Sequence, residues 1–411
     1  MATTEVEAVP RSSYGAWFAS ARHALNRPLT AYYLLLGSCA LLLTIGLIMV
    51  LSASSVWSYK EYDGDSYAVV KRQLTWVLIG VPSALIASRL PVRWIRALAW
   101  PALIVAAVLL ALTTTSLGVT RNAQTNWLAL GPVDVQPSEI AKLAVILWAA
   151  HVYANKDRLL GSLHHVIVPV IPGLMLIIGL VLWQRDLGTA LVLFAIALAM
   201  LWIVGTPGKL FGLALSSVGV LVFALAASDQ ERLSRLTSFT DPFRDYADSG
   251  WQSAHGLLAL SSGGVFGEGI GAGQQKWGKL PEAHTDFIFA VLGEELGLAG
   301  TLLVIALFLA IAYAATRVAL QTADPFVRYA SFGVVVWLLG QMIINVGMVL
   351  ALLPVVGIPL PLVSYGGSAL VPSLVALGLV IGFARREPEA ARALAARRRP
   401  RAVGLSARRA R

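Results

Sequence analysis

The sequence predicts an all-α polytopic membrane protein with ten transmembrane helices and a long extracellular loop between helices 7 and 8. Of its 411 residues, 57% are hydrophobic and only 13% are charged, and the mean hydropathy is +0.73. An ordinary soluble domain contains about 25% charged residues, so this composition excludes a water-soluble globular protein. The single cysteine, Cys39, lies in an apolar run, which excludes an internal disulfide framework.

Ten apolar segments are long enough, or nearly so, to cross the hydrocarbon core, which takes about 17 to 25 helical residues. The segment at 138–154 is the weakest, because Glu139 and Lys142 lie at its start, and the segment at 286–315 is long enough to tilt or protrude. The predicted spans are 32–52, 74–90, 97–115, 138–154, 166–183, 187–204, 210–227, 286–315, 327–353 and 364–384.

The distribution of Lys and Arg predicts the orientation. Ten spans put both termini on one side, and if that side is the cytoplasm, 21 of the 32 Lys and Arg residues lie in inner segments and 10 in outer ones. Cytoplasmic segments of membrane proteins carry this excess, so we expect both termini in the cytoplasm. Residues 1–31 contain no short apolar core with a cleavage site and are expected to be a cytoplasmic extension, not a cleaved signal peptide.

The net charge of +10 is concentrated at the C-terminal end, where ten arginines follow residue 384. We expect residues 385–411 to be a basic cytoplasmic tail that lies on anionic membrane lipid. A protein-docking role for this tail is the alternative. Because the charge gathers next to the membrane, no nucleic acid partner is predicted.

The only long connection is the outer loop at about 228–285, and loops of this length in compact proteins are usually functional or disordered. Six glycines lie at its centre, between residues 263 and 273. They resemble a dinucleotide-binding fingerprint only superficially, since no strand precedes them and no βαβ unit surrounds them. A flexible loop whose backbone amides approach a phosphate is the better interpretation.

Asp286 stands at the start of the eighth span. It could cap that helix by accepting its free amides, or it could act as a general base, and the sequence favours neither role. Glu282 lies four residues earlier, where an exposed loop charge is the simple interpretation.

Several ionisable residues lie at hydrocarbon depth. Glu294 and Glu295 are expected roughly 12 to 13 Å along the helix from Asp286, where a carboxylate costs about 2.5 to 3.5 kcal/mol unless it has a partner or water. Structural interhelical pairs explain such charges as well as a functional site does. Together they favour one shared polar site that faces outward, and its further members are Glu139, Lys142, Arg185 and Asp186.

Three prolines, Pro354, Pro359 and Pro361, separate the last two spans, and no helix can continue through them. The chain must therefore break or re-enter there, which is tolerated only where protein or water satisfies the backbone. Gln341 and Asn345, four residues apart, share one helix face as hydrogen-bonding glue or as ligand contacts.

At this point the motifs resemble one family, the SEDS polytopic proteins FtsW and RodA of bacterial cell division, elongation and sporulation. The similarity covers residues 32–384. It rests on Ser52-Ala53-Ser54 ahead of Arg72-Gln73, Gln136-Pro137-Ser138-Glu139 with Lys142, Gln184 through Thr189, Pro281 through Phe287, Gly293 through Gly297, Asn345 to Gly347, and Pro354 through Ser368.

The resemblance implies a peptidoglycan glycosyltransferase that polymerises lipid II, working with a class B penicillin-binding protein. The residue matching Asp286 is the proposed catalytic carboxylate, and those matching Glu139, Lys142 and Asp186 belong to a polar cavity. The chain departs from the family at Arg185, where proline is usual, and at Asn126, where arginine is common. Substrate-binding candidates are Glu139, Lys142, Asp186, Arg72, Arg185, Glu282, Gln341, Asn345 and Ser364.

The chemistry fits these residues. Lipid II carries an α-linked sugar and the product is β-1,4-linked, so one inverting displacement needs a base, expected to be Asp286, and a means of stabilising the departing undecaprenyl diphosphate. Lys142, with Arg72 or Arg185, would offset that charge. A divalent cation, Mg or Mn, held by Asp186 or Glu139 would share the task, although no ligand spacing demands it.

Two alternatives remain open: a lipid II flippase, because broken helices and intramembrane charges also mark transporters, and a non-catalytic scaffold for the transpeptidase. The His284 motif and the cytoplasmic extensions favour the FtsW-like branch. We therefore expect a bacterial plasma-membrane protein at the division septum, with lipid II and other divisome membrane proteins as partners.

Overall fold

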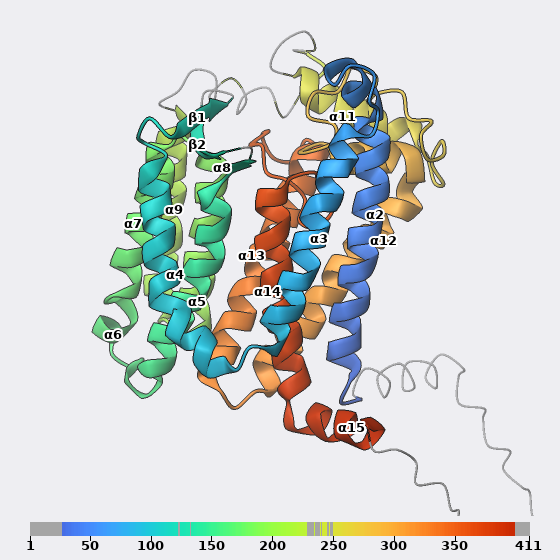
Figure 1. Ribbon diagram of the computed structural model, residues 1–411. Helices are drawn as coiled ribbons and strands as arrows, with labels where there is room; N and C mark the ends of the chain where they lie inside the picture. The colour runs from blue at the N-terminus through green and yellow to red at the C-terminus, as the bar shows by residue number, and fades with distance from the viewer. Residues whose placement is uncertain are drawn as a thin grey trace, which may run out of the picture.

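The computed structural model describes residues 27–398, except 122–123, 132, 228–233, 235–238, 240, 245 and 247–249. In this part of the chain, long helices form a bundle and three short strands lie at one end of it (Figure 1). The predictions for residues 1–26 and for 399–411, which include most of both cytoplasmic extensions, lie outside the described residues.

Each predicted apolar segment overlaps a described helix, and the helices at Trp251–Ser262 and Pro388–Arg398 lie outside these segments, in the predicted loop and tail. The described helices are α2 Thr30–Glu61, α3 Ala68–Arg89, α4 Val92–Leu112, α5 Pro137–Asn155, α6 Leu163–Ile167, α7 Val170–Trp183, α8 Leu187–Ile203, α9 Gly208–Ala227, α11 Trp251–Ser262, α12 Ile288–Gln321, α13 Pro325–Val349, α14 Gly367–Arg386 and α15 Pro388–Arg398, with a single 3₁₀ turn at Asp157–Leu159.

Eight helical segments in the described residues are long and apolar enough to cross a membrane: α2, α3, α4, the α6–α7 segment Leu163–Trp183, α9, α12, α13 and α14. Helix α8 is apolar but has only 17 residues. Helix α5, which carries Glu139 and Lys142, is not among the eight. The chain is therefore a mostly helical, multi-pass membrane protein.

The bundle is built around α13 and α14, each with 67% of its most apolar window buried. Helix α14 packs chiefly against α3, α12 packs against α2 and α13, and α5 lies between α4 and α13. By contrast, no described residue in the apolar window of α9 is buried. Lipid is the natural solvent for such a face, since water would oppose its exposure.

The strands β1 Gly118–Arg121, β2 Gln124–Leu130 and β3 Val133–Val135 form an antiparallel sheet in that order. Residues Leu128 and Val135 pair in the second ladder, and the chain then enters α5 directly. The sheet and α11 lie at one end of the bundle, while the start of α2 and helix α15 lie at the other (Figure 1). The sequence predicted no strands here, because runs of three to seven residues carry little periodicity.

Small residues let α3 and α14 approach closely. Gly378 and Gly382 lie four residues apart on α14, opposite Ala84 and Ser88 of α3. A Cβ atom at Gly378 would stand 2.3 Å from the carbonyl oxygen of Ala84, and one at Gly382 would stand 2.5 Å from that of Ser88. Such a stripe is a common way for membrane helices to gain packing contacts that lipid cannot replace.

We expect Gly378→Ala to lower the free energy of unfolding in detergent by about 1 to 3 kcal/mol, because the backbone of α3 must move to admit the methyl group. Gly219→Ala on α9 is the matched control, since its Cβ would meet nothing within 4 Å. The control should be neutral or slightly stabilising, because alanine favours helix more than glycine does. Equal effects of both substitutions in denaturant titrations would contradict this interpretation of the contact.

Candidate active site

Asp286 lies in the turn that leads into α12, and the start of α12 lies at the same end of the bundle as the strands (Figure 1). Phe287 is the N-cap residue of α12, and no side-chain capping bond is made there. Of the two roles that the sequence left open for Asp286, the structure therefore does not support helix capping. Its half-buried carboxylate remains available for chemistry.

Two buried polar side chains hold the backbone on either side of this carboxylate. Asn345 Nδ2 of α13 donates to the carbonyl oxygens of Asp286 (2.7 Å) and Ile358 (2.8 Å). Ser364 Oγ donates to the carbonyl oxygen of Thr285 (2.6 Å) and accepts from the amide of Leu360 (2.8 Å). The predicted residues Asn345 and Ser364 thus position Asp286 through its backbone and do not contact its carboxylate.

A third clamp comes from Gln73 of α3, which is 1% exposed. Its Nε2 donates to the carbonyl oxygen of Ser364 (3.3 Å), and its Oε1 accepts from the amide of Gly366 (3.2 Å). We call residues 350–366, the non-helical stretch between α13 and α14, the proline segment. Gln73 was not among the predicted site residues, although it follows Arg72 in a family motif.

The electrostatic surroundings of Asp286 raise its pKa. Burial raises the pKa of this carboxyl to about 7, and the negative charges of Glu282 and Asp186 act in the same direction. A carboxyl with this pKa is partly ionised near neutral pH, where a general base is most effective.

Asp186 has a structural role of its own as the N-cap of α8. Its Oδ1 accepts from the amide of Thr189 (2.8 Å), and its Oδ2 accepts from the hydroxyl of Thr189 (2.9 Å), from Asn126 Nδ2 (2.9 Å) and from Gln136 Nε2 (3.3 Å). Asn126, where the family commonly has arginine, therefore reaches the same carboxylate as a neutral donor. Helix capping explains the bonds from Thr189, and the side-chain amides of Asn126 and Gln136 supply the other donors to this carboxylate.

The proline segment lies against both aspartates. A Cβ atom at Gly188 would stand 2.6 Å from the carbonyl oxygen of Val356 and 3.7 Å from Asp186 Oδ1. Gly357, which follows Val356 in the chain, would place a Cβ atom 3.4 Å from Asp286 Oδ2. Two adjacent residues of this segment therefore contact the start of α8 and the carboxylate of Asp286.

Glu139 and Lys142 form a buried ion pair on α5, with Nζ 2.7 Å from Oε1 and side chains no more than 3% exposed. Lys142 Nζ also lies 5.5 Å from the centre of the Trp337 ring, whose indole N–H donates to Gln341. The predicted residues Glu139, Lys142 and Gln341 thus gather in one place. Glu139 Oε2 has no hydrogen-bond partner in the described part of the chain.

The other predicted residues are exposed. Arg72 donates to the hydroxyl of Tyr62 (2.9 Å) and lies 4.7 Å from the centre of its ring. Glu282 has a positive φ of 53°, and its carboxylate accepts from the hydroxyl of Thr285 (2.7 Å). Arg185 also has a positive φ, 61°, at the turn before α8. Proline cannot adopt this φ, so the departure from the family at Arg185 comes with a different backbone conformation.

Glu294 and Glu295 bind residues 263–279, which we call the glycine-rich loop, and have no described contact with Asp286. Glu294 accepts from the amides of Gln274 (2.7 Å) and Gln275 (3.1 Å). Glu295 accepts from Lys276 Nζ (2.5 Å) and from Ser52 Oγ (2.7 Å), and Lys276 also donates to Ser52 (2.8 Å). All three side chains of this triad are buried, and the described partners of Glu294 and Glu295 belong to the loop and to α2.

The glycine-rich loop repairs a break in α12. Gly297 has φ 66° and ψ −164°, which interrupts the helix. The carbonyl oxygens of Glu294 and Glu295 then accept from the amides of Glu268 (3.0 Å) and Gly269 (3.1 Å), and the amides of Leu298 and Ala299 donate back to the loop, to the carbonyl oxygens of residues 264 and 265. These glycines allow close backbone approach to α12, which differs from the predicted role of a phosphate-binding loop.

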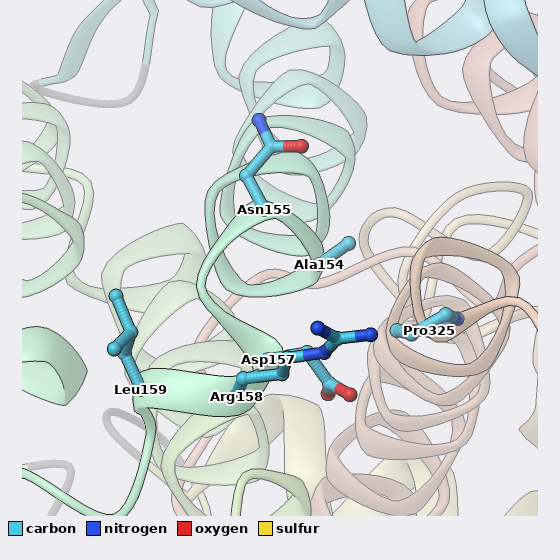
Figure 2. Close-up of a pocket in the computed structure, with 6 residues that line it drawn as sticks. All are labelled: Ala154, Asn155, Asp157, Arg158, Leu159 and Pro325. Carbon is cyan, nitrogen blue, oxygen red and sulfur yellow. The ribbon is translucent and has the colours of Figure 1, made fainter.

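Two surface hollows lie away from these residues. One, of about 510 Å³, is lined by Ala154, Asn155, Asp157, Arg158, Leu159 and Pro325 at the opposite end of the bundle (Figure 2). The other, of about 620 Å³, lies between α4 and α7 and is mostly apolar. No predicted site residue lines either hollow. Among the described residues, no three His, Cys, Asp or Glu side chains gather closely enough to hold a metal ion.

The fold and the motifs define a polytopic membrane protein with a carboxylate held at one end of its helical bundle. Residues 33–388 match the family of cell cycle proteins that comprises FtsW, RodA and SpoVE, and the chain belongs to this family. The match covers every residue of the site described above.

Curated relatives are similar over most of their length. The chain is 39% identical over 390 residues to the probable peptidoglycan glycosyltransferase FtsW of Mycobacterium tuberculosis, covering 95% of this chain and 73% of the relative. It is 36% identical over 347 residues to the stage V sporulation protein E of Bacillus subtilis, covering 84% and 94% of the two chains.

Solved structures share the fold. A chain from a study of structural coordination of polymerization and crosslinking by a peptidoglycan synthase complex superposes with a TM-score of 0.70 at 26% identity, covering 86% of this chain and 97% of that one. The rod shape determining protein RodA of Thermus thermophilus superposes with a TM-score of 0.63 at 27% identity, covering 87% and 97%.

We expect Asn345→Ala to destabilise the fold by about 1 to 3 kcal/mol, because it leaves the carbonyl oxygens of Asp286 and Ile358 buried without their donor. Asn155→Ala, which removes an exposed amide that bonds Arg96 and His151 at the other end of the bundle, should cost less, about 0.5 to 1 kcal/mol. Denaturant titration in detergent measures both values. A silent Asn345→Ala would mean that this amide does not fix the Asp286 backbone.

Proposed function

We propose that the chain is a peptidoglycan glycosyltransferase that polymerises lipid II into β-1,4-linked glycan strands and releases undecaprenyl diphosphate. Family membership and the named FtsW relatives support the activity. The single structural observation that carries the mechanism is the carboxylate of Asp286. It does not cap α12, and burial raises its pKa to about 7.

We further propose a topology of ten spans, with α5 and α8 crossing the membrane beside the eight clearly apolar segments. Both lie within the bundle, where α5 contacts α4 and α13, and α8 contacts α13. An even number of spans agrees with the start of α2 and helix α15 lying at the same end (Figure 1). The excess of Lys and Arg assigns that end to the cytoplasm and the Asp286 end to the exterior.

The reaction is a single displacement with inversion at the anomeric carbon of the donor. Asp286 takes the proton from the 4-hydroxyl of the acceptor sugar. The oxygen of this hydroxyl bonds to the anomeric carbon of the donor, and the bond from that carbon to undecaprenyl diphosphate breaks. A positioned general base contributes about 10² to 10⁴ to the rate. The clamps from Asn345, Ser364 and Gln73 hold the backbone around this base, which preserves its position relative to the sugars.

Cationic side chains offset the charge of the departing diphosphate. Arg72 and Arg185 are the exposed candidates near this end, whereas Lys142 is buried and paired with Glu139. We assign Arg72 the direct contact and the Glu139–Lys142 pair the support of the surrounding polar cavity. Ser364, Glu282 and Gln341 complete the proposed site.

A class B penicillin-binding protein is the proposed partner, together with other divisome membrane proteins at the division septum. The similarity to a chain of a peptidoglycan synthase complex that coordinates polymerization with crosslinking supports this pairing. The partner would cross-link the glycan strands that this chain makes.

Purified Asp286→Asn protein should fold and bind its partner but form no glycan polymer from lipid II, because an amide cannot take the proton. The loss should be at least about a hundredfold, the lower limit for a general base. Polymer length and amount are measured on gels with labelled lipid II in detergent, where no sidedness exists. A flippase would give no polymer even with the wild-type chain.

Asp65→Asn is the matched control, since Asp65 is a carboxylate near the same end that pairs with Lys71 on the surface. It should polymerise at the wild-type rate. Wild-type polymer from Asp286→Asn as well would contradict the catalytic assignment and would leave the scaffold alternative.

The polymerisation rate should depend on pH through the raised pKa of Asp286. Below about pH 7 the carboxyl is increasingly protonated, so the rate should fall about tenfold per pH unit, and above about pH 8 it should be constant. The free energy of unfolding should change in the opposite direction. Because the pKa of this carboxyl is raised in the folded state, its ionisation destabilises the fold as pH rises. A rate that is flat from pH 5 to 8 would contradict this pKa.

A further inference from the structure

Four aromatic side chains form a connected cluster beside Asp286. The rings of Trp57 and His284 stack, with centroids 5.1 Å apart and planes at 27°. Tyr62 meets Trp57 edge-on at 5.8 Å, and Tyr365 meets His284 at 5.5 Å. We call these four residues the aromatic cluster. It joins the end of α2, the turn before α12 and the proline segment.

The aromatic cluster is fixed to the backbone that carries the proposed base. The amide of Tyr365 donates to the carbonyl oxygen of His284 (2.9 Å), only two residues before Asp286. The adjacent Ser364 holds the carbonyl oxygen of Thr285. A ligand that lies on these rings is therefore held at a defined position relative to the carboxylate.

One ring of the cluster is open to a ligand. Trp57 is 43% exposed, although its stacking on His284 covers part of the indole. Burial lowers the pKa of His284, which favours the neutral imidazole in this stack. Arg72, which packs on the Tyr62 ring, adds an exposed guanidinium at the rim.

These features match the chemistry of a sugar. A pyranose ring carries hydroxyl groups around its edge and C–H bonds on its faces, so it packs one face on an exposed aromatic ring. Tyr and Trp offer large apolar faces at little cost in side-chain entropy, and their polar atoms bond the hydroxyls. An aromatic residue that only anchors the protein at the membrane interface needs no such stack against a catalytic turn.

We propose that the aromatic cluster is a saccharide-binding platform that holds a sugar ring of the glycan substrate against the Asp286 site, with Trp57 as its exposed face. The proposal rests on the proposed glycosyltransferase function, since it names the group that a further subsite binds. The same chemistry occurs in the growing glycan strand and in the disaccharide of lipid II. Arg72 at the rim would pair with an acidic substituent of the sugar.

The test measures binding apart from catalysis. The full-length Asp286→Asn protein in detergent is titrated with a soluble tetrasaccharide of alternating N-acetylglucosamine and N-acetylmuramic acid, without lipid or peptide, by saturation-transfer NMR. Trp57→Ala should weaken binding about three- to tenfold, the value of one aromatic contact. Trp57→Phe, which keeps a ring, should recover most of the affinity.

Tyr67→Ala is the matched control, because Tyr67 is another exposed aromatic residue, 58% exposed, at the same end of the chain. It should bind the tetrasaccharide as the unchanged protein does. If Trp57→Ala matches this control, the platform is wrong. If Trp57→Ala raises the KM for lipid II in bilayers without weakening tetrasaccharide binding, Trp57 acts as a membrane anchor, and the proposal is again wrong.

The source of the sugar follows from a second pair of measurements on the otherwise wild-type chain. If the platform holds the growing strand, Trp57→Ala shortens the polymer at an unchanged KM for lipid II. If it holds the lipid-linked disaccharide, KM rises and strand length is kept. Failure of the wild-type chain to polymerise lipid II would contradict the proposed function alone, since tetrasaccharide binding is read independently.

Discussion

Satisfaction of the backbone hydrogen bonds in non-helical segments is the constraint on which this structure depends. An apolar surrounding offers no water to an amide or a carbonyl group that leaves the helical pattern, and each such group left unpaired costs several kcal/mol. The chain leaves that pattern at two places near Asp286. Asn345, Ser364 and Gln73 pair with the proline segment and the turn before α12, and the glycine-rich loop pairs with α12 at its break.

The same constraint explains why the proposed base and the residues that hold its backbone are different residues. Asn345 and Ser364 donate hydrogen bonds to backbone carbonyl groups, and Asp186 accepts one from an amide at the start of α8. The carboxylate of Asp286 caps no helix, and it appears in no ion pair among the described residues. Burial of the Asp286 carboxyl, together with the negative charges of Glu282 and Asp186, raises its pKa to about 7.

The helices could be predicted well from the sequence and the contacts of the site only in part. An apolar run of fixed length predicts a spanning helix directly, and the end predicted for the segment at 166–183 coincides with the end of α7 at Trp183. The triad of Ser52, Lys276 and Glu295 could not be predicted, because 224 residues separate Ser52 from Lys276. The break at Gly297 was hidden as well, since a glycine inside an apolar run does not reveal its φ angle.

The break at Gly297 ties the N-terminal part of α12 to the glycine-rich loop. The carbonyl groups of Glu294 and Glu295 accept hydrogen bonds from the amides of residues 268 and 269. Separation of the loop from the helix would therefore leave several amide and carbonyl groups without partners. The two pieces must travel together. A displacement of residues 263–279 is thus transmitted to the stretch of helix that begins two residues after Asp286.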